Sequence, residues 1–388
     1  MEEWKQYRLI DVLDKLIDYR GKTPKKTTSG VPLITAKIIK NGRIDTPTEF
    51  ISVDDYDSWM VRGLPKVGDV VLTTEAPLGE VAQLDNENIA LAQRVVTLRG
   101  KAGVLDNTYL KYYLMSNVGQ QRIKARETGT TVTGIKQSEL REVLVDCPPY
   151  KLQVEIASIL KSLDYKIEMN RRINDNLEQQ AQALFDETLM DEKLPRNRVL
   201  KDYAYINPTR SIKKGEIARY IDMSSLPTKG SFPSDWVDKA YNGGMKFQNG
   251  DTLMARITPC LENGKAAYIN FLKKDETAFG STEYIVMAPH EGIPSEMFYF
   301  LARNEDFVSY AVAHMNGSSG RQRVSASDIE NYIMPDMPPH LIEQFGMKAN
   351  AIMEAIKTNS IESRRLAEMR DTLLPKLMSG ELKVNEII

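Results

Sequence analysis

Residues 151–190 read KLQVEIASILKSLDYKIEMNRRINDNLEQQAQALFDETLM, and this stretch decides how the rest of the chain is organised. Apolar residues recur in it at alternating spacings of four and three, the pattern of a coiled-coil seam. Asn170 and Asn174 occupy two seam positions in its middle. At about 1.5 Å per residue such a helix is roughly 60 Å long, too long for one compact domain. The stretch therefore predicts a long spacer helix.

The helical stretch occurs twice in the chain. A shift of 189 residues moves Leu152 onto Leu341, Asn170 onto Asn359 and Leu184 onto Leu373, so one constant offset holds along the whole helix. We predict a tandem duplication in which a long helix closes each half. The predicted seam consists of Ile156, Leu160, Leu163, Ile167, Asn170, Leu177 and Leu184 in the first copy and Phe345, Ile352, Ile356, Asn359, Leu366 and Leu373 in the second.

Two features of these helices have alternative interpretations. Asn170 and Asn359 either fix the register of the coiled coil or are merely tolerated beside a wet seam. The second helix is expected to run from about His340 to Leu374 and to stop before Pro375, because an interior proline removes a helical hydrogen bond. Leucines gather at its end, and they form either core against the first domain or a docking surface for a partner.

The segments before each helix predict two mixed α/β domains. In the first, residues 31–39 and 68–76 have the composition of strands, and 107–125 has helical spacing with an aromatic stripe expected to be core. GDVVLTTEAPLGEVA (68–82) returns as GDTLMARITPCLENGKAA (250–267), and GTTVTGIKQSEL (129–140) returns as GSSGRQRVSASDI (317–329). The framework repeats while the loops diverge, which predicts two modules for two different ligands.

Composition excludes several classes of protein. The chain has 388 residues, a net charge of −2 and no apolar run of membrane-spanning length, so we expect a cytoplasmic protein without membrane contact. Two cysteines and three histidines at scattered positions offer no disulfide framework, metal site or catalytic triad. No phosphate-binding loop or nucleophile motif is present. We expect no catalytic residue, and no metal or cofactor bound by this chain.

Basic loops are the candidates for contact with nucleic acid, because arginine and lysine bind phosphates and arginine also reads guanine edges. Each loop could also be a solvated surface, and the mild negative net charge counts against a DNA-binding protein that acts alone. The candidate DNA-binding residues are Arg20, Lys22, Lys25, Lys26, Arg122, Lys124, Arg126, Thr130, Thr131 and Lys136 in the first half and Arg210, Lys213, Lys214, Lys246, Arg256, Arg321 and Arg323 in the second.

Two divergent α/β modules, each followed by a long helix, resemble the specificity subunits of type I restriction-modification systems. The resemblance covers essentially the whole chain and is carried most strongly by residues 148–185 and 362–382, with GKTP (21–24) and GDVVL (68–72) as weaker support. It implies target recognition domains at 1–150 and 193–339, spacer helices at 151–192 and 340–377, and a tail at 378–388. The α+β fold would be pseudo-twofold symmetric, with the helices paired as an antiparallel coiled coil.

The resemblance also implies a function in defence against foreign DNA. Each module would read one half of a split, asymmetric double-stranded DNA sequence. Two methyltransferase subunits would bind S-adenosylmethionine and methylate adenine N6, and endonuclease subunits using ATP and magnesium would complete the restricting complex. This chain would then be a non-catalytic subunit. Base-reading residues cannot be transferred, because the modules of this family vary too much.

Two other functions are alternatives to DNA recognition. A coiled-coil adaptor whose modules bind proteins would be favoured if the basic loops were scattered over the surface. A self-contained nuclease or methyltransferase is disfavoured because the motifs of both enzymes are missing.

Overall fold

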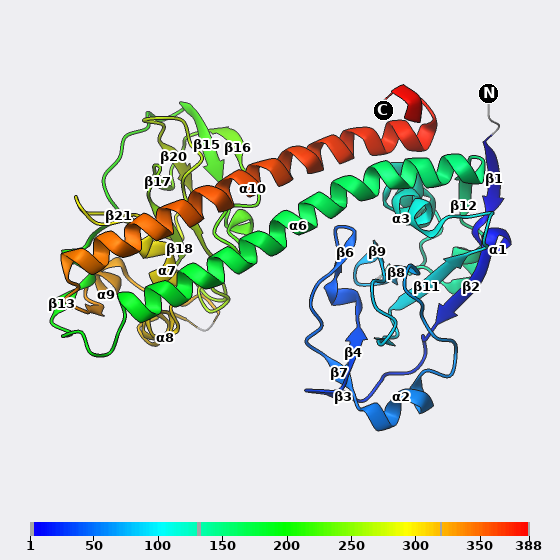
Figure 1. The fold of residues 1–388 in the computed structure, drawn as a ribbon, viewed down its shortest axis with the longest axis horizontal. Coiled ribbons are helices and arrows are strands. Elements are labelled where there is room, and N and C mark those ends of the chain that lie inside the picture. Colours follow the sequence, from blue (N-terminus) through cyan, green and yellow to red (C-terminus); the bar gives the residue numbers. More distant parts are fainter. Residues whose placement is uncertain (1–3, 130–132, 319, 387–388) are drawn as a thin grey trace. The chain divides into compact units, whose positions relative to one another are not determined.

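The chain folds into two compact units, as the computed structural model of residues 4–129, 133–318 and 320–386 shows. Unit 1 comprises Met1–Lys166 and Leu366–Ile388, and unit 2 comprises Ile167–Arg365. Two long helices, α6 (Tyr150–Thr188) and α10 (Pro339–Ser379), each contribute to both units (Figure 1). The predicted α+β tandem repeat with two long helices is confirmed.

Unit 1 contains two four-stranded sheets, of order β2-β11-β8-β9 and β10-β4-β7-β3, and the short pairs β1-β12 and β5-β6. The strands are β1 (Lys5–Arg8), β2 (Leu13–Asp18), β3 (Lys26–Thr27), β4 (Val31–Ile34), β5 (Ile39–Lys40), β6 (Arg43–Ile44), β7 (Phe50–Ile51), β8 (Val70–Thr74), β9 (Leu78–Gln83), β10 (Ala90–Leu91), β11 (Val95–Gly100) and β12 (Leu144–Cys147). The shorter helices are α1 (Leu9–Val12), η1 (Ala36–Ile38), α2 (Val53–Trp59), α3 (Asn107–Met115), α4 (Asn117–Lys124), α5 (Gln137–Arg141) and η4 (Val384–Glu386).

Unit 2 has the sheets β14-β21-β18-β19 and β16-β15-β20-β17 and the pair β13-β22. Its strands are β13 (Arg198–Val199), β14 (Ala204–Ile206), β15 (Ile217–Ile221), β16 (Val237–Ala240), β17 (Met245–Phe247), β18 (Thr252–Ala255), β19 (Ala266–Tyr268), β20 (Ala278–Gly280), β21 (Tyr284–Pro289) and β22 (Ile333–Met334). The shorter helices are η2 (Leu200–Asp202), η3 (Met223–Ser225), α7 (Met297–Arg303), α8 (Glu305–Ala313) and α9 (Ala326–Glu330).

The two units share one topology. In each, the central sheet follows the same strand order, with β14, β21, β18 and β19 taking the places of β2, β11, β8 and β9. The second sheets share a core of one parallel and one antiparallel pairing: β10 and β7 flank β4, as β20 and β16 flank β15. They differ at the edge, since β3 pairs with β7 whereas β17 pairs with β20. The duplication seen in the sequence is therefore a duplication of the fold.

The aromatic stripe of the first half is core, as predicted. Tyr109, Tyr112 and Tyr113 on α3 are fully buried beside the central sheet of unit 1. The single helix expected at 107–125 is wrong, because it breaks at Ser116 into α3 and α4. The Ser116 hydroxyl accepts a hydrogen bond from the Gly119 backbone N–H at 3.2 Å and so caps the second helix.

Within unit 2, α6 and α10 pack antiparallel through a polar seam. Asn170 donates to the Ser363 hydroxyl (3.2 Å), and Asn359 donates to the Asn174 side-chain oxygen (2.9 Å). These two contacts are equivalent under the 189-residue repeat, because it maps Asn170 onto Asn359 and Asn174 onto Ser363. The seam thus contains a local twofold relation. Among the predicted seam positions, Ile156, Leu160, Asn170, Phe345 and Ile356 are buried, and Leu163, Ile167, Leu177, Leu184, Ile352, Asn359, Leu366 and Leu373 are half-buried.

Within unit 1, the seam carries an ionic cluster centred on Asp164. Its carboxylate accepts from Arg370 (Nη1, 2.8 Å), Lys111 (Nζ, 2.9 Å) and the Tyr112 hydroxyl (2.7 Å). Burial alone would raise the pKa of Asp164, but the Lys111 charge and these hydrogen bonds outweigh it and hold the pKa below its usual value. The cluster joins α3, α6 and α10 in one site, and it explains why a charged residue lies on the inner face of α10.

The expected end of the second helix before Pro375 is wrong. Pro375 lies inside α10, which continues to Ser379. Leu374, Leu377 and Met378 are buried in the core of unit 1, and Leu373 packs against it, while Pro375 itself is exposed. Burial of these side chains outweighs the one hydrogen bond that proline removes. The leucine cluster is thus core of the first domain. The first helix ends at Thr188, slightly earlier than the predicted 192.

Removing the Asp164 carboxylate should strongly destabilise unit 1. Asp164→Ala leaves Lys111, which is only 7% exposed, without its counter-charge. Breaking a buried ion pair in this way costs about 3–5 kcal/mol. We expect this loss in the free energy of unfolding, measured by urea denaturation of the full chain.

Asp371→Ala is the matched control, because Asp371 also pairs with Arg370 (2.8 Å) but its side chain is 63% exposed. It should cost less than about 1 kcal/mol. Equal losses for the two variants would contradict the structural role of the buried cluster.

Candidate nucleic-acid interface

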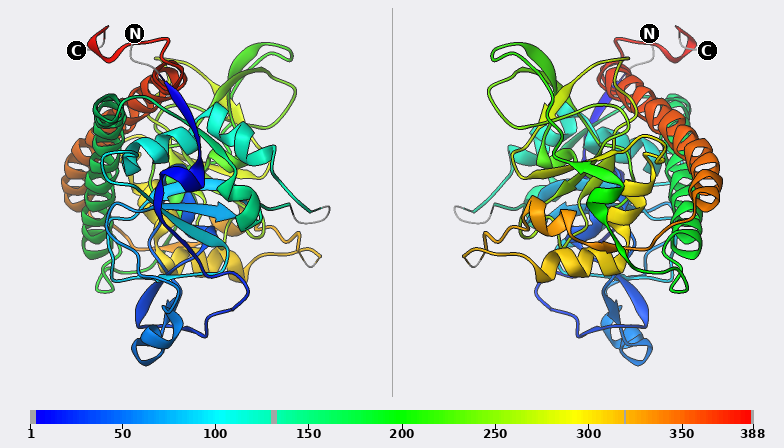
Figure 2. Two further views of the ribbon diagram at one scale, coloured as in Figure 1. Left: turned by 90° about the vertical axis from the view of Figure 1, so that its right-hand side faces the viewer. Right: turned by 90° about the vertical axis from the view of Figure 1, so that its left-hand side faces the viewer.

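A hairpin stands on the same backbone framework in each unit. In unit 1, Thr128 and Gly134 exchange backbone hydrogen bonds, and the Ile135 N–H donates to the Thr74 carbonyl at 3.0 Å. In unit 2, Asn316 and Arg323 exchange them, and the Val324 N–H donates to the Arg256 carbonyl at 3.0 Å. The chain on either side of each hairpin can be followed in Figure 2. Thr130 and Thr131, two of the predicted contacts, lie outside the described residues.

Basic side chains gather at the foot of the unit 1 hairpin. Arg20, Arg62 and Lys136 line a surface hollow together with Leu16, Asp18 and Gln137. Arg20 pairs with Asp18 and donates to the Ile135 carbonyl, both at 2.6 Å, while Arg62 donates to the carbonyls of Asp18 (3.0 Å) and Arg20 (2.7 Å). Lys136 is exposed. Sequence reasoning missed Arg62, since it stands alone in an unremarkable loop.

The unit 2 hairpin carries a different set of charges. Arg323 pairs with Glu283 through its Nε and Nη2 atoms, with Nη2 2.7 Å from the carboxylate. The hydrogen bond from Arg323, its charge and the charge of Arg256 hold the pKa of Glu283 below its usual value, against the effect of burial. Arg321 is exposed on the same hairpin. The structure thus brings Arg256, Arg321 and Arg323 together.

Several of the predicted DNA-binding residues already have partners within the chain. Arg122 pairs with Asp146 (3.0 Å), Arg126 with Glu139 (3.0 Å), Lys26 with Glu49 (2.9 Å), and Lys246 donates to the Arg210 carbonyl (3.0 Å). Among the described residues, the predicted cations that are exposed and make no ion pair are Lys22, Lys25, Lys124, Lys136, Lys213, Lys214 and Arg321. Since no acidic side chain of the described residues pairs with these cations, they are open to an external anion.

Arg210 serves the interior of unit 2. Its guanidinium contacts Gln248 and lies 2.5 Å from the carboxylate of Asp251, which is 1% exposed. Burial raises the pKa of Asp251 to about 6, although the charge of Arg210 opposes this shift. The predicted DNA contact is therefore also the counter-charge of a buried acid.

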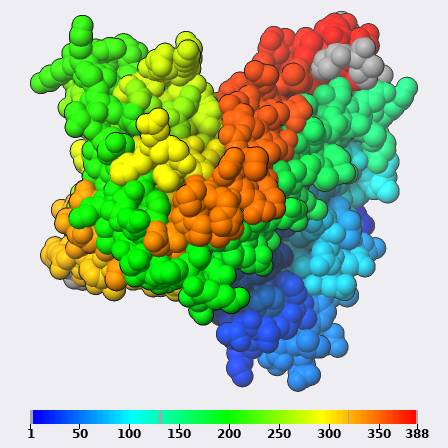
Figure 3. All heavy atoms as spheres, turned by 60° about the vertical axis from the view of Figure 1, so that its left-hand side comes forward, coloured from blue at the N-terminus to red at the C-terminus, as the bar shows by residue number. Residues whose placement is uncertain are grey.

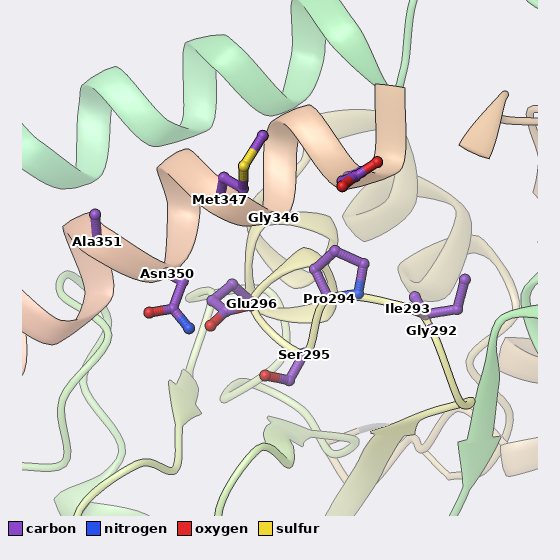
Figure 4. A pocket seen from close by; sticks show the side chains of 10 residues that line it. Gly292, Ile293, Pro294, Ser295, Glu296, Gly346, Met347, Asn350 and Ala351 are labelled. Atoms are coloured by element: carbon purple, nitrogen blue, oxygen red, sulfur yellow. The ribbon is translucent and has the colours of Figure 1, made fainter. Parts of the chain in front are cut away.

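A hollow of unit 2 beside α10 has the wrong charge for nucleic acid. It lies between α10 and residues 292–296, and Figure 4 shows Ser295, Glu296 and Asn350 on its walls. Glu343 also lines it, so two carboxylates and no cation face the space. Figure 3 shows part of α10 (orange) at the surface of the molecule. Phosphate groups would be repelled here.

Two kinds of site are absent from the residues that the structure describes. No helix in these ranges combines the length and apolar character needed to cross a bilayer. No group of three or more histidine, cysteine, aspartate or glutamate side chains in the same ranges is arranged to hold a metal ion.

Comparison with known proteins shows which class of protein this chain resembles. Residues 1–179 match the family described as "Type I restriction modification DNA specificity domain". The MjaIX specificity subunit of Methanocaldococcus jannaschii is 26% identical over 92% of this chain and 88% of its own length. The HindI specificity subunit of Haemophilus influenzae is 20% identical over 98% of this chain and its full length. A crystal structure of the S subunit from M. genitalium shares the fold, with a TM-score of 0.60 and 16% identity over 97% of this chain and 96% of that one. Over nearly its whole length, the chain is thus similar to specificity subunits of type I restriction-modification systems.

Replacing Arg210 should damage stability in a pH-dependent way. Arg210→Ala leaves ionised Asp251 buried without its cation, which costs about 3–5 kcal/mol at pH 7. Because the folded-state pKa of Asp251 lies above its ordinary value, the folded protein takes up the proton first as the pH falls from about 6 towards 4. A protonated Asp251 needs no counter-charge, so the loss relative to the unchanged protein should shrink over that range.

Unfolding free energies of both proteins at pH 7 and pH 5 provide the measurement. Lys214→Ala, an exposed cation in the same loop, is the control and should leave stability unchanged. A pH-independent loss in Arg210→Ala would show that Asp251 is not the group involved.

Proposed function

We propose that this chain is the DNA sequence-recognition subunit of a type I restriction-modification complex and that each unit reads one half of a split, asymmetric target. The observation that carries the proposal is the repeated hairpin. Its backbone hydrogen bonds are the same in both units, while the charges around it differ. One scaffold with two different polar surfaces suits two different half-sites.

The proposed partners rest on the similarity to type I specificity subunits. Two methyltransferase subunits would bind S-adenosylmethionine and methylate adenine N6, and endonuclease subunits with ATP and magnesium would cut foreign DNA in the cytoplasm. This chain would contribute no catalytic residue. Phosphate contacts supply much of the affinity of a protein for DNA. The net charge of −2 therefore suits a subunit whose partners make part of the phosphate contacts.

A coiled-coil adaptor for protein partners is less well supported. Arg20, Arg62 and Lys136 converge at the foot of one hairpin, and Arg256, Arg321 and Arg323 at the other. Cations clustered beside the hairpin of each repeated unit favour a polyanion as the ligand.

The direct test is a map of N6-methyladenine. The chain is expressed with its methyltransferase partner in a host that lacks adenine methylation, and the genome is sequenced at single-molecule level. We expect a split methylated motif only when this chain is present. The same motif without the chain, or no methylation beside a demonstrably active methyltransferase, would contradict the proposal.

A second test concerns the phosphate contact. Lys136 is exposed, makes no ion pair within the described residues and lies in the basic hollow of unit 1. Lys136→Ala should weaken DNA binding by the assembled complex equally for all sequences. It should also reduce the slope of log affinity against log salt concentration by about one, the value for one phosphate contact. Affinity is measured at several salt concentrations.

Lys5→Ala is the matched control for Lys136→Ala, because Lys5 is also an exposed lysine of unit 1 and lies on β1, at a distance along the chain from the hairpin. It should leave both affinity and salt slope unchanged. Similar slopes for Lys136→Ala and the unchanged protein would exclude a phosphate contact at Lys136.

A further inference from the structure

Three equivalent positions surround the foot of the hairpin in each unit. The first, which we term the strand-start position, is Arg94 in unit 1 and Glu283 in unit 2. The Arg94 carbonyl accepts from the Thr74 N–H at 3.0 Å, as the Glu283 carbonyl accepts from the Arg256 N–H at 3.0 Å. Each directly precedes the matching central strand, β11 or β21. The two residues therefore occupy the same backbone site with opposite charge.

The other two positions face each other across a β-bridge. The turn position is Glu75 in unit 1 and Ile257 in unit 2, and the hairpin position is Gly134 in unit 1 and Arg323 in unit 2. Glu75 bridges Gly134, and Ile257 bridges Arg323, both antiparallel. Since the bridges are the same, these positions correspond in the backbone, and it is their side chains that differ.

Each unit places one arginine–glutamate pair on this common site, but in a different arrangement. In unit 1, Arg94 at the strand start pairs with Glu75 at the turn, with Nε 2.7 Å from Oε1. In unit 2, Glu283 at the strand start pairs with Arg323 on the hairpin. The sign at the strand start is reversed, and the counter-charge has moved from the turn to the hairpin. Both units thus place an arginine–glutamate pair on this site, with the guanidinium at a different position in each.

The stability of the fold depends little on these two ion pairs. The side chains of Arg94 and Glu75 are 48% and 39% exposed, and that of Arg323 is 40% exposed. Ion pairs so open to water contribute little to folding. Such a pair does orient the arginine, because the carboxylate fixes the plane of the guanidinium group.

The arginine of each pair retains donors for a ligand. A guanidinium has five N–H donors. In Arg323, Glu283 takes the Nε–H and one Nη2–H, and the Arg321 carbonyl accepts from Nη1 at 3.2 Å. Two N–H groups remain, the number that a bidentate contact with the O6 and N7 atoms of guanine requires. In Arg94, the contact with the Glu75 carboxylate is made by Nε, at 2.7 Å.

We propose that Arg94 in unit 1 and Arg323 in unit 2 contact guanine edges in the two half-sites, and that Glu75 and Glu283 are the positioning residues that aim them. The inference rests on the proposed function and deepens it, since it names the residues that set sequence preference in each unit. The exchanged arrangement then places the reading guanidinium at a different point of the same surface in each unit. That difference contributes to the asymmetry of the target.

Exchange of the two charges within one pair tests the proposal. The double variant Glu75→Arg with Arg94→Glu keeps an ion pair but moves the guanidinium to the turn position. It should change the base preference in one half of the methylated motif and leave the other half and the spacing intact. Affinity for the original half-site should fall by about 5- to 150-fold, the range for loss of one bidentate base contact.

The same exchange at an unrelated surface pair is the control. Arg43 and Asp45 in unit 1 are 51% and 45% exposed and 3.4 Å apart, so Arg43→Asp with Asp45→Arg should leave the motif unchanged. An unchanged motif in the Glu75/Arg94 exchange, with normal methylation by the complex, would overturn this inference while leaving the proposed function intact. Absence of any split motif with the unchanged chain would overturn the proposed function itself.

The aiming role of the glutamate has its own readout. Glu283→Gln should relax the preference at one position of the other half-site while overall affinity for DNA is kept, because Arg323 remains but is no longer held. Glu283→Asp should restore part of the preference. Equal losses of affinity for matched and mismatched DNA in Glu283→Gln, without rescue by Glu283→Asp, would show that Glu283 only supports the fold.

Discussion

The polar seam between α6 and α10 is the constraint on which the rest of the structure depends. In unit 2 the Asn170–Ser363 and Asn359–Asn174 contacts are satisfied in only one register of the two helices. In unit 1 Asp164 plays the same part, since it must meet Arg370 on α10 and Lys111 on α3 together. A slip of one helix along the other would leave these groups buried without partners, which costs far more than an apolar mismatch. The seam therefore fixes which residues of the two helices face each other.

The repeat makes a symmetrical seam without making the units identical. At the seam position related to Asp164 and Arg370 by the duplication, unit 2 has Met353 and Ala181, both buried in its apolar core. At this position, an ion pair joins the two helices in unit 1, whereas apolar side chains pack in unit 2. The same separation of framework from side chains recurs at the hairpins, where identical backbone hydrogen bonds carry Arg94 in one unit and Glu283 in the other.

Much of the architecture could be predicted from the sequence, because it rests on periodicity. The heptad spacing and the constant offset predict both long helices and the duplication, and the aromatic stripe of α3 is typical of core. The break at Ser116 and the passage of α10 through Pro375 could not be predicted, since a local cap and the burial of Leu377 and Met378 decide them. Both are outcomes of tertiary packing that local propensity does not contain.

The candidate interface was harder to predict, because a basic residue in a loop gives no sign of what it touches. Arg122 and Arg210 have the same sequence signature as Lys136, yet Asp146 and Asp251 hold their guanidinium groups. Arg62 and Arg94 gave no signal at all, and only the fold brings them to the hairpin of unit 1.

Two modules of one topology share a scaffold whose register is set by the contacts between α6 and α10. The most direct measurement exchanges residues 189–338, the segment between the end of α6 and the start of α10, for the matching segment of a relative with a different known target. Methylation mapping of the hybrid complex should then show one changed half of the motif, with the other half and the spacing between them preserved. A hybrid in which both halves or the spacing change would contradict the account.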